Sequence, residues 1–376
     1  FLTERAWQLP YSTRVDSITN FQHTYAEEDD LIVKDLVTRE ELNDIENPVS
    51  YSKLKQIALK EPLLMGRSIN ADASVTSVNV LMTFPGEHPM EIPEAVAEAR
   101  KLVDEFKTKF PNHEVHLSGV TMLNNAFNEA GVKDMTTLTP AMYGVIILIM
   151  FILLRSLSAV FATFIVMLLS IISGMGFAGW MGIPITPPSS IAPVVIMTLA
   201  IADSIHILKS VFGALGGSTT KRDAIIEGLR VNLKPVFLTS ATTIVGFLSL
   251  NFSDTPPFHD LGNMTSIGVA MAFFLSVTML PAIMMLLPLK VSPSRHSQNQ
   301  WSPRFGSWVC EKRMPIAILS SIATIWIGSQ IPKMELNDDF IGYFSEDNAF
   351  RVDSTYTMNN LTGIYQVNFD LKSGES

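Results

Sequence analysis

The chain alternates between stretches that mix polar and apolar residues and stretches that are almost wholly apolar. Residues 1–133 are mixed, residues 140–289 are largely apolar, and the chain turns polar again after residue 331. A membrane-spanning helix needs about 20 predominantly apolar residues. Segments of about this length lie at 137–155, 157–181, 189–209, 235–252, 266–289 and 314–331. Soluble folds do not repeat such segments, so the pattern predicts a polytopic α-helical membrane protein.

The polar first part of the chain has the pattern of a mixed helix and strand domain. Residues 78–84 alternate apolar and polar side chains, which is typical of a half-buried strand. Residues 91–110 repeat apolar side chains at the spacing of an amphipathic helix, and residues 115–117 suggest a second strand. We therefore expect an extracytoplasmic α+β domain over residues 1–135, built on a ferredoxin-like, split βαβ unit. A further helix, 121–134, is expected to lead into the first span.

The remaining segments complete the expected domain organisation. The predicted parts are a five-span membrane block at 136–289, a cytoplasmic linker at 290–313, a single span at 314–331 and the start of a second outward domain at 332–376. Alternation at Val367, Phe369 and Leu371 predicts a strand in that last part. A short amphipathic helix is expected at 219–233. This order suggests a duplicated layout, and we interpret the chain as a fragment of a longer protein.

Charge distribution predicts the orientation of the spans. Lys and Arg gather in residues 210–234 and 290–313, whereas the alternate loops 182–188 and 253–265 contain neither. Cytoplasmic loops carry an excess of Lys and Arg, so the first two segments are expected in the cytoplasm and both polar ends outside. The net charge of −9 argues against nucleic acid as a partner. We expect a multi-pass protein of the bacterial inner membrane with periplasmic soluble domains.

The most informative residue is Asp203, the only carboxylate in the apolar segment 192–208. A carboxylate near the centre of a bilayer costs roughly 2.5–3.5 kcal/mol on insertion scales, and such groups mark proton or ion pathways. A carboxyl group removed from water favours its neutral form, so it can bind and release a proton. The residue is therefore predicted to be a proton-relay acid. The alternative is a buried acid with a structural role only.

Polar neighbours on the same segment extend this predicted relay. His206 lies three residues after Asp203 and so shares its helix face. Ser204 is adjacent to the acid, and Ser210 continues the polar face towards the cytoplasm. His206 and Ser204 are predicted members of the relay and Ser210 a supporting residue. The alternative for His206 is a hydrogen-bonded packing residue.

The next span supplies further hydroxyl groups. Thr239, Ser240, Thr242 and Thr243 lie within five positions there, and Thr239 and Thr243 share one helix face. These two are predicted to support the relay, although the sequence does not show which face meets Asp203. Hydroxyl groups in spans also serve as hydrogen-bonding contacts between helices, which is the alternative for each.

Several kinds of chemistry find no support in the sequence. The single cysteine, Cys310, leaves no intramolecular disulfide or cysteine-based metal cluster. No phosphate-binding loop with the spacing GxxxxGK[ST] occurs, so ATP is not expected to supply energy within this chain. His113 and His116 are too few to indicate a metal site, and no nucleophile–base–acid set stands out. We expect no cofactor, no metal and no enzyme activity.

Three stretches together resemble the RND superfamily, specifically its MMPL-like branch, which is related to sterol-sensing-domain proteins such as Patched. They are TLAIADSIHIL at 198–208, HLSGVTMLNNAF at 116–127 and the long segment 237–286, which begins FLTSATTIVGF. The stretch NDDFIGYFSEDNAFRVD at 337–353 is similar to the start of this family's second outward domain.

This resemblance implies twelve spans in two halves with two large periplasmic domains, of which the chain would hold spans two to seven. It also implies export of lipids or other hydrophobic molecules, driven by the proton gradient. Asp203 aligns with the family's fourth-span acid. Many relatives have an aspartate–tyrosine or paired-aspartate pattern there, whereas this chain has Asp203 and Ser204. The partner of Asp203 in the tenth span would lie outside the chain.

The expected partners are a proton, a hydrophobic or lipid-like substrate, membrane lipids and the second half of the same protein. A homo-oligomer is left open. Two other functions also remain open. One is a sterol or lipid sensor that does not transport, and the other is an accessory subunit of protein secretion.

Overall fold

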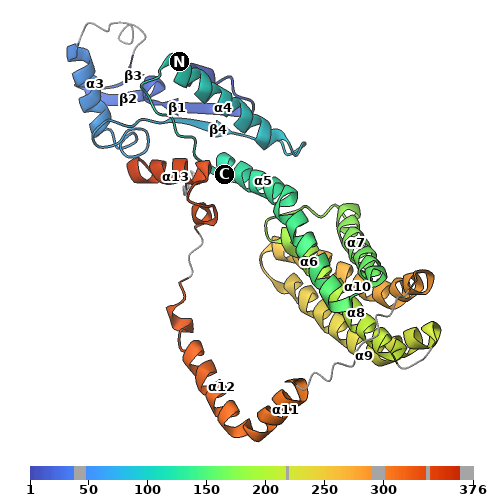
Figure 1. Cartoon of the computed structure of the whole chain (residues 1–376). Coiled ribbons are helices and arrows are strands. Elements are labelled where there is room, and N and C mark those ends of the chain that lie inside the picture. Colours follow the sequence, from blue (N-terminus) through green and yellow to red (C-terminus); the bar gives the residue numbers. More distant parts are fainter. Residues whose placement is uncertain (38–47, 217–219, 289–300, 336–338, 365–376) are drawn as a thin grey trace, which may run out of the picture. The chain divides into compact units, whose positions relative to one another are not determined.

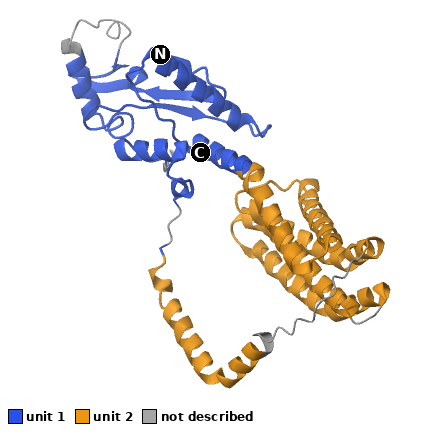
Figure 2. Ribbon diagram, viewed as in Figure 1, with its two compact units in different colours: residues 1–133, 335–376 blue, residues 134–334 orange. Residues whose placement is uncertain are grey.

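The computed structural model describes residues 1–37, 48–216, 220–288, 301–335 and 339–364. It divides into two compact units (Figure 2). One unit joins residues 1–133 to residues 335–376, and the other comprises residues 134–334. The strand expected around Val367 lies outside the described residues.

The first unit contains a two-stranded antiparallel sheet covered by a helix. Strand β1 (Ser12–Ser17) pairs with β4 (Val78–Met82), and α4 (Glu91–Lys109) packs against them. Val15 and Leu102 meet in this small core, where they are 1% and 8% exposed. The strand and the amphipathic helix expected here are therefore confirmed.

The strand order of the first unit differs from the expected one. Residues 115–117 form no strand, so β4 has no partner following α4. The second sheet is instead a hairpin of β2 (Gln22–Glu27) and β3 (Asp30–Asp35). The short apolar pair Val115 and Leu117 was too weak a signal, because two alternating residues do not distinguish a strand from an extended loop. A ferredoxin-like unit is not confirmed.

Two further helices complete the described part of this unit. Helix α3 (Pro48–Lys60) contributes to a cluster of buried apolar residues, namely Leu36, Ala58, Leu64 and Ile69. Helix α5 (Val120–Thr136) packs its Leu123 against Phe344 and Phe350. Phe344 directly follows the short 3-10 helix η5 (Phe340–Tyr343), and Phe350 lies in the first turn of α13 (Ala349–Asn360).

Side-chain contacts within this unit also join residues 116–118 to α13. The Nδ1 atom of His116 lies 2.7 Å from Oδ1 of Asp353, and the His116 ring stacks on Tyr356 with centroids 4.0 Å apart. The hydroxyl group of Ser118 donates to that of Ser354 at 3.0 Å. Residues more than two hundred positions apart thus fold into one unit.

A buried carboxylate fixes the turn that precedes α4. Glu91 is 5% exposed and accepts hydrogen bonds from the backbone N–H groups of Gly86, Glu87 and His88 at 2.9, 2.8 and 3.0 Å. Gly86 has φ +77°, a left-handed conformation that glycine adopts without strain. The amide of Gly86, followed by the other two amides, holds the pKa of Glu91 below its usual range.

The substitution Glu91→Gln should loosen this turn, because a side-chain amide offers one acceptor oxygen where the carboxylate offers two. A lowered pKa in the folded protein means that the stabilisation is present above the ordinary value of about 4.3 and is lost as pH falls through the lowered value. We expect faster amide exchange at residues 86–88 in the variant at neutral pH. In the wild type, protection corrected for intrinsic exchange should fall on acidification.

Hydrogen–deuterium exchange of the whole protein measures both effects. Glu87→Gln is the matched control, because the side chain of Glu87 is exposed. Equal protection of the turn in wild type and Glu91→Gln at neutral pH would contradict the prediction.

The second unit contains the long apolar helices (Figure 1). They are α6 (Leu138–Leu154), α7 (Leu157–Trp180), α8 (Ala192–Leu215), α9 (Lys221–Leu248), α10 (Pro256–Leu286) and α12 (Arg313–Gly328). Together with α5 before α6, the described residues contain six helical stretches long and apolar enough to cross a membrane. The chain is therefore a polytopic helical membrane protein, as its apolar pattern predicts.

Two helices begin earlier than expected. The predicted amphipathic helix 219–233 and the span 235–252 form one helix, α9, which continues through Pro235. The separate short helix was thus wrong, because a proline within a membrane helix interrupts the backbone ladder without ending the helix. Helix α10 starts at Pro256 rather than near residue 266, since proline is favoured in the first helical turn.

The expected cytoplasmic linker, 290–313, contains a further helix. Its residues 301–311 form α11 (Trp301–Glu311).

Helices α7, α8 and α10 pack closely on one another. Gly174 of α7 and Gly268 of α10 both face the buried side chain of Ile196 on α8. A Cβ atom on Gly174 would lie 3.0 Å from the Cα atom of Gly268 and 2.9 Å from Cδ1 of Ile196. Glycine is therefore required at this crossing, where small residues let helix backbones approach.

Candidate functional site

The candidate site lies where α8 meets α9. Asp203 on α8 is 5% exposed, and Ser240 on α9 is 4% exposed. The Ser240 hydroxyl group donates a hydrogen bond to Oδ2 of Asp203 at 3.2 Å. Ser240 is one of four hydroxyl residues between positions 239 and 243, and only the packing of the two helices identifies it as the one that meets the acid.

Close packing of α8 and α9 produces this contact. A Cβ atom on Gly228 of α9 would lie 3.2 Å from the backbone N of Val211 and 3.3 Å from the carbonyl O of Ile207. One turn further along α9, Asn232 Nδ2 donates to the Ser210 hydroxyl oxygen at 2.7 Å. The two antiparallel helices keep this pairing as far as Asp203 and Ser240.

The structure places the other predicted relay residues of α8 differently. Ser204 is fully buried, and its hydroxyl group donates to the carbonyl O of Ala200 at 2.7 Å. His206 is exposed on the second unit, and no hydrogen bond joins it to Asp203 in the described part of the chain. Ser210 is tied to Asn232, a contact that the sequence pattern did not reveal.

The two threonines chosen on α9 do not contact the acid. The Thr239 hydroxyl group donates to the carbonyl oxygens of Pro235 and Val236, at 3.1 and 2.9 Å. That of Thr243 donates to the carbonyl O of Thr239 at 2.8 Å. Both side chains therefore bond within their own helix, and their role in a relay stays a prediction.

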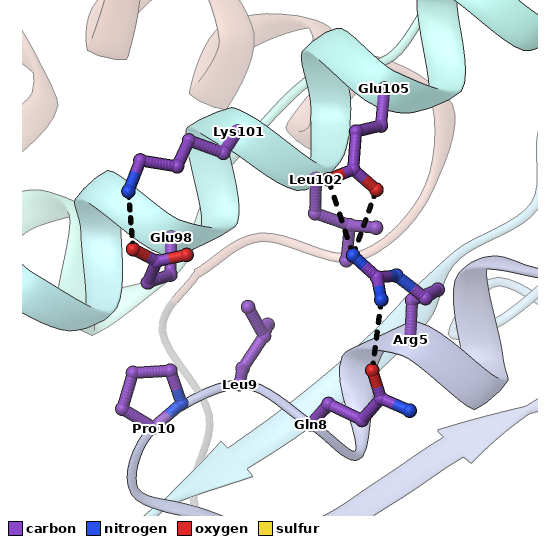
Figure 3. A pocket seen from close by; sticks show the side chains of 8 residues that line it. All are labelled: Arg5, Gln8, Leu9, Pro10, Glu98, Lys101, Leu102 and Glu105. Carbon is purple, nitrogen blue, oxygen red and sulfur yellow. Dashed lines mark hydrogen bonds and ion pairs between the residues drawn. The ribbon is translucent and has the colours of Figure 1, made fainter.

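The described residues offer little else that could hold a ligand. They contain no group of three or more His, Cys, Asp or Glu placed to bind a metal ion. A hollow of about 360 Å³ lies between α1 (Leu2–Ala6) and α4 in the first unit (Figure 3). Its central charge, Arg5, is paired with Glu105 at 2.9 Å and also donates to Gln8 at 3.0 Å. Arg5 Nε is buried without a hydrogen-bond partner in the described structure, but both terminal nitrogens of the guanidinium group are already bonded. The hollow is therefore a weaker candidate than the buried acid.

The contact between Asp203 and Ser240 can form in either protonation state of the carboxyl group. An ionised carboxylate accepts hydrogen bonds only, whereas the protonated form also donates one. The Ser240 hydroxyl can serve either form, since it is both a donor and an acceptor. A charge taken out of water is costly unless it is paired. A change in the protonation of Asp203 would therefore change the hydrogen bond between α8 and α9.

Comparison with known proteins places the chain in a family. The model of the MMPL family matches residues 11–318. "Putative membrane protein MJ1562" of Methanocaldococcus jannaschii is 24% identical over 229 residues, which are 60% of this chain and 58% of that protein. "Probable transport protein MmpL10" of Mycobacterium leprae is 31% identical over 116 residues, which are 30% of this chain and 11% of that protein.

The chain thus matches somewhat more than half of the first relative's length and about a ninth of the second's. The family match covers all of helices α6 to α10, including Asp203 and Ser240. It confirms the resemblance carried by residues 198–208 and 237–286. Since the match extends over most of the sequence, this chain belongs to the MMPL family.

Proposed function

We propose that the chain is part of a transporter that exports hydrophobic or lipid-like molecules, with Asp203 as the acid that binds and releases the driving proton. The single observation that supports this most strongly is the buried carboxyl of Asp203, hydrogen-bonded to Ser240 of the neighbouring helix. Family membership and the transport protein among its relatives agree with it.

The proposed mechanism follows from the cost of burying charge. Protonation of Asp203 removes the charge from the interior, and deprotonation restores it and strengthens the hydrogen bond donated by Ser240. Because α8 also packs tightly against α7 and α10, a change in its contact with α9 shifts its position within the block. We propose that this shift is passed to the extracytoplasmic domains, which would hold the path of the cargo.

The wider assignment is part of the same proposal. The protein would lie in a bacterial inner membrane with residues 1–135 and 332–376 on the periplasmic side and residues 210–234 in the cytoplasm. Its partners would be protons, membrane lipids and the second half of the same protein, which would supply the partner of Asp203 from another span. His206, on the exposed face of α8, would then be available to that half.

Transport by the full-length protein in liposomes tests this proposal. The probe is a dye-labelled phosphatidylethanolamine, and an imposed pH gradient supplies the energy. We expect lipid movement that requires the gradient and stops when a protonophore collapses it. Liposomes that contain no protein give the background rate.

A lipid sensor built on the same block gives a different result. It would bind the labelled lipid equally well with and without the gradient and would not move it across the membrane. Binding that is independent of the gradient, with lipid movement at the background rate, would exclude the proposed function.

A further inference from the structure

Helix α11 has large apolar side chains along one side. Phe305, Trp308 and Val309 are three and four positions apart, the spacing that places side chains together on a helix. The rings of Phe305 and Trp308 stack with their centroids 5.8 Å apart, so these side chains do meet. The two residues are nevertheless 49% and 50% exposed. We call Phe305, Trp308 and Val309 the apolar face of α11.

The opposite side of α11 carries small and polar side chains. Successive helical residues point about 100° apart, so Ser307 lies roughly 200° round the helix from Phe305, and Cys310 roughly 200° round from Trp308. Both Ser307 and Cys310 are exposed. A helix with one apolar and one polar side is suited to a boundary between an apolar phase and water.

The next helix holds the end of α11 at such a boundary. Helix α12 begins two positions after α11 ends, and its stretch is long and apolar enough to cross a membrane. None of the side chains of α12 is buried within the described structure. Lys312 and Arg313 stand at its start, and such residues place their charges where hydrocarbon gives way to water. Helix α11 therefore adjoins the membrane surface at the Arg313 end of α12.

The backbone changes direction between the two helices. Lys312 has φ −99° and ψ 24°, outside the helical range, and α11 turns away from α12 at this point (Figure 1). In a straight continuation, Phe305 and Trp308 would lie in water, about 12 and 8 Å beyond Arg313, since each helical residue adds about 1.5 Å. The turn at Lys312 instead allows α11 to lie along the surface.

We propose that α11 lies in the lipid headgroup layer of the membrane, with its apolar face inserted towards the acyl chains and Cys310 facing water. Insertion removes two half-exposed rings from water, which is favourable. Tryptophan is suited to this layer, because its large apolar ring also carries a polar N–H group. The placement would fix the depth of the Arg313 end of α12. It concerns α11 alone and does not depend on the proposed transport function.

Spin labelling of the full-length protein in liposomes of phosphatidylethanolamine and phosphatidylglycerol tests this placement. Other cysteines are replaced by serine, and one label is attached either to native Cys310 or to Val309→Cys in a Cys310→Ser background. Collision with oxygen reports exposure to lipid, and collision with a water-soluble nickel chelate reports exposure to water. We expect the ratio of oxygen to nickel collisions to be several-fold higher at position 309 than at position 310.

These two adjacent positions control for each other, because they share one helix and differ in the direction they face. Frequent nickel collisions at both positions would show that α11 projects into water. Shielding of position 309 from both reagents would show that another protein segment covers the apolar face. Either result would overturn the proposal.

The fluorescence of Trp308 gives a second readout without a label. The emission lost in the variant Trp308→Phe is that of Trp308, and the substitution keeps an aromatic ring in the apolar face. Brominated acyl chains in the liposomes should quench this emission, whereas iodide on both sides of the membrane should not. Trp7 is the control, since it is equally exposed but belongs to the first unit. The emission lost in Trp7→Phe should be quenched by iodide only, and the same result for Trp308 would exclude an inserted α11.

Discussion

Asp203→Asn in the full-length protein should reduce gradient-driven lipid movement to the background rate of protein-free liposomes. Asparagine has nearly the same shape and still accepts a hydrogen bond from Ser240, but it does not bind or release a proton in this pH range. Because the substitution removes a buried ionisable group without leaving a cavity, the amount of folded protein in the membrane should stay close to that of the wild type. Dye-labelled phosphatidylethanolamine in liposomes with an imposed pH gradient gives the rate.

Two variants of α9 show whether the effect belongs to this contact. Ser240→Ala removes the donor at 3.2 Å but keeps the acid, so transport should fall to a level between the wild type and Asp203→Asn. A hydrogen bond to a charged group contributes about 1.5–3 kcal/mol, which makes this loss measurable. Thr242→Val alters a hydroxyl bonded to its own helix and should transport normally. Wild-type transport by Asp203→Asn would refute the role of the acid.

Gly268→Ala should destabilise the membrane block by about 1–3 kcal/mol, the usual cost of overpacking a tight interior. An added Cβ atom would overlap the side chain of Ile196, which is fully buried and has no free space to move into. The effect is measured as a lowered Tm of the purified protein in detergent. Gly176→Ala on α7 is the matched control, since a Cβ atom there would meet nothing within 4 Å.

Substitution of Ile196, the residue that the added Cβ atom would overlap, gives a sharper test. Ile196→Ala alone should cost about 2–5 kcal/mol, because it leaves a cavity in the core. In the double variant with Gly268→Ala, the new methyl group occupies part of that cavity. The double variant should therefore be less destabilised than the sum of the two single variants, which is the sign of direct contact. Additive losses would show that the helices do not cross at these residues.

Much of the architecture could be predicted from local sequence patterns. Each span is encoded by its own run of apolar residues, since hydrocarbon requires every backbone polar group to bond within its segment. For the same reason the single carboxylate at Asp203 was conspicuous in the sequence. Boundaries were less well predicted, because helices such as α9 extend beyond the apolar region with polar residues such as Lys221 and Arg222.

The pairing of distant segments was not encoded in any local pattern. Strand β4 pairs with β1, about sixty residues earlier, rather than with the residues that follow α4. His116 meets Asp353 across more than two hundred positions. Such contacts depend on how whole elements pack, whereas a period of two or of 3.6 residues identifies only the type of each element.

The sequence by itself determined that this is a membrane protein, where its spans lie and which buried acid is exceptional, because these properties depend on the transfer of each segment from water to hydrocarbon. Only the tertiary structure decided which hydroxyl group meets Asp203. That choice depends on the rotation of each helix about its axis, which is set by close contacts such as the one at Gly228. The four hydroxyl residues between positions 239 and 243 point in different directions from the helix axis, so no pattern along the chain could select Ser240 before the helices were packed.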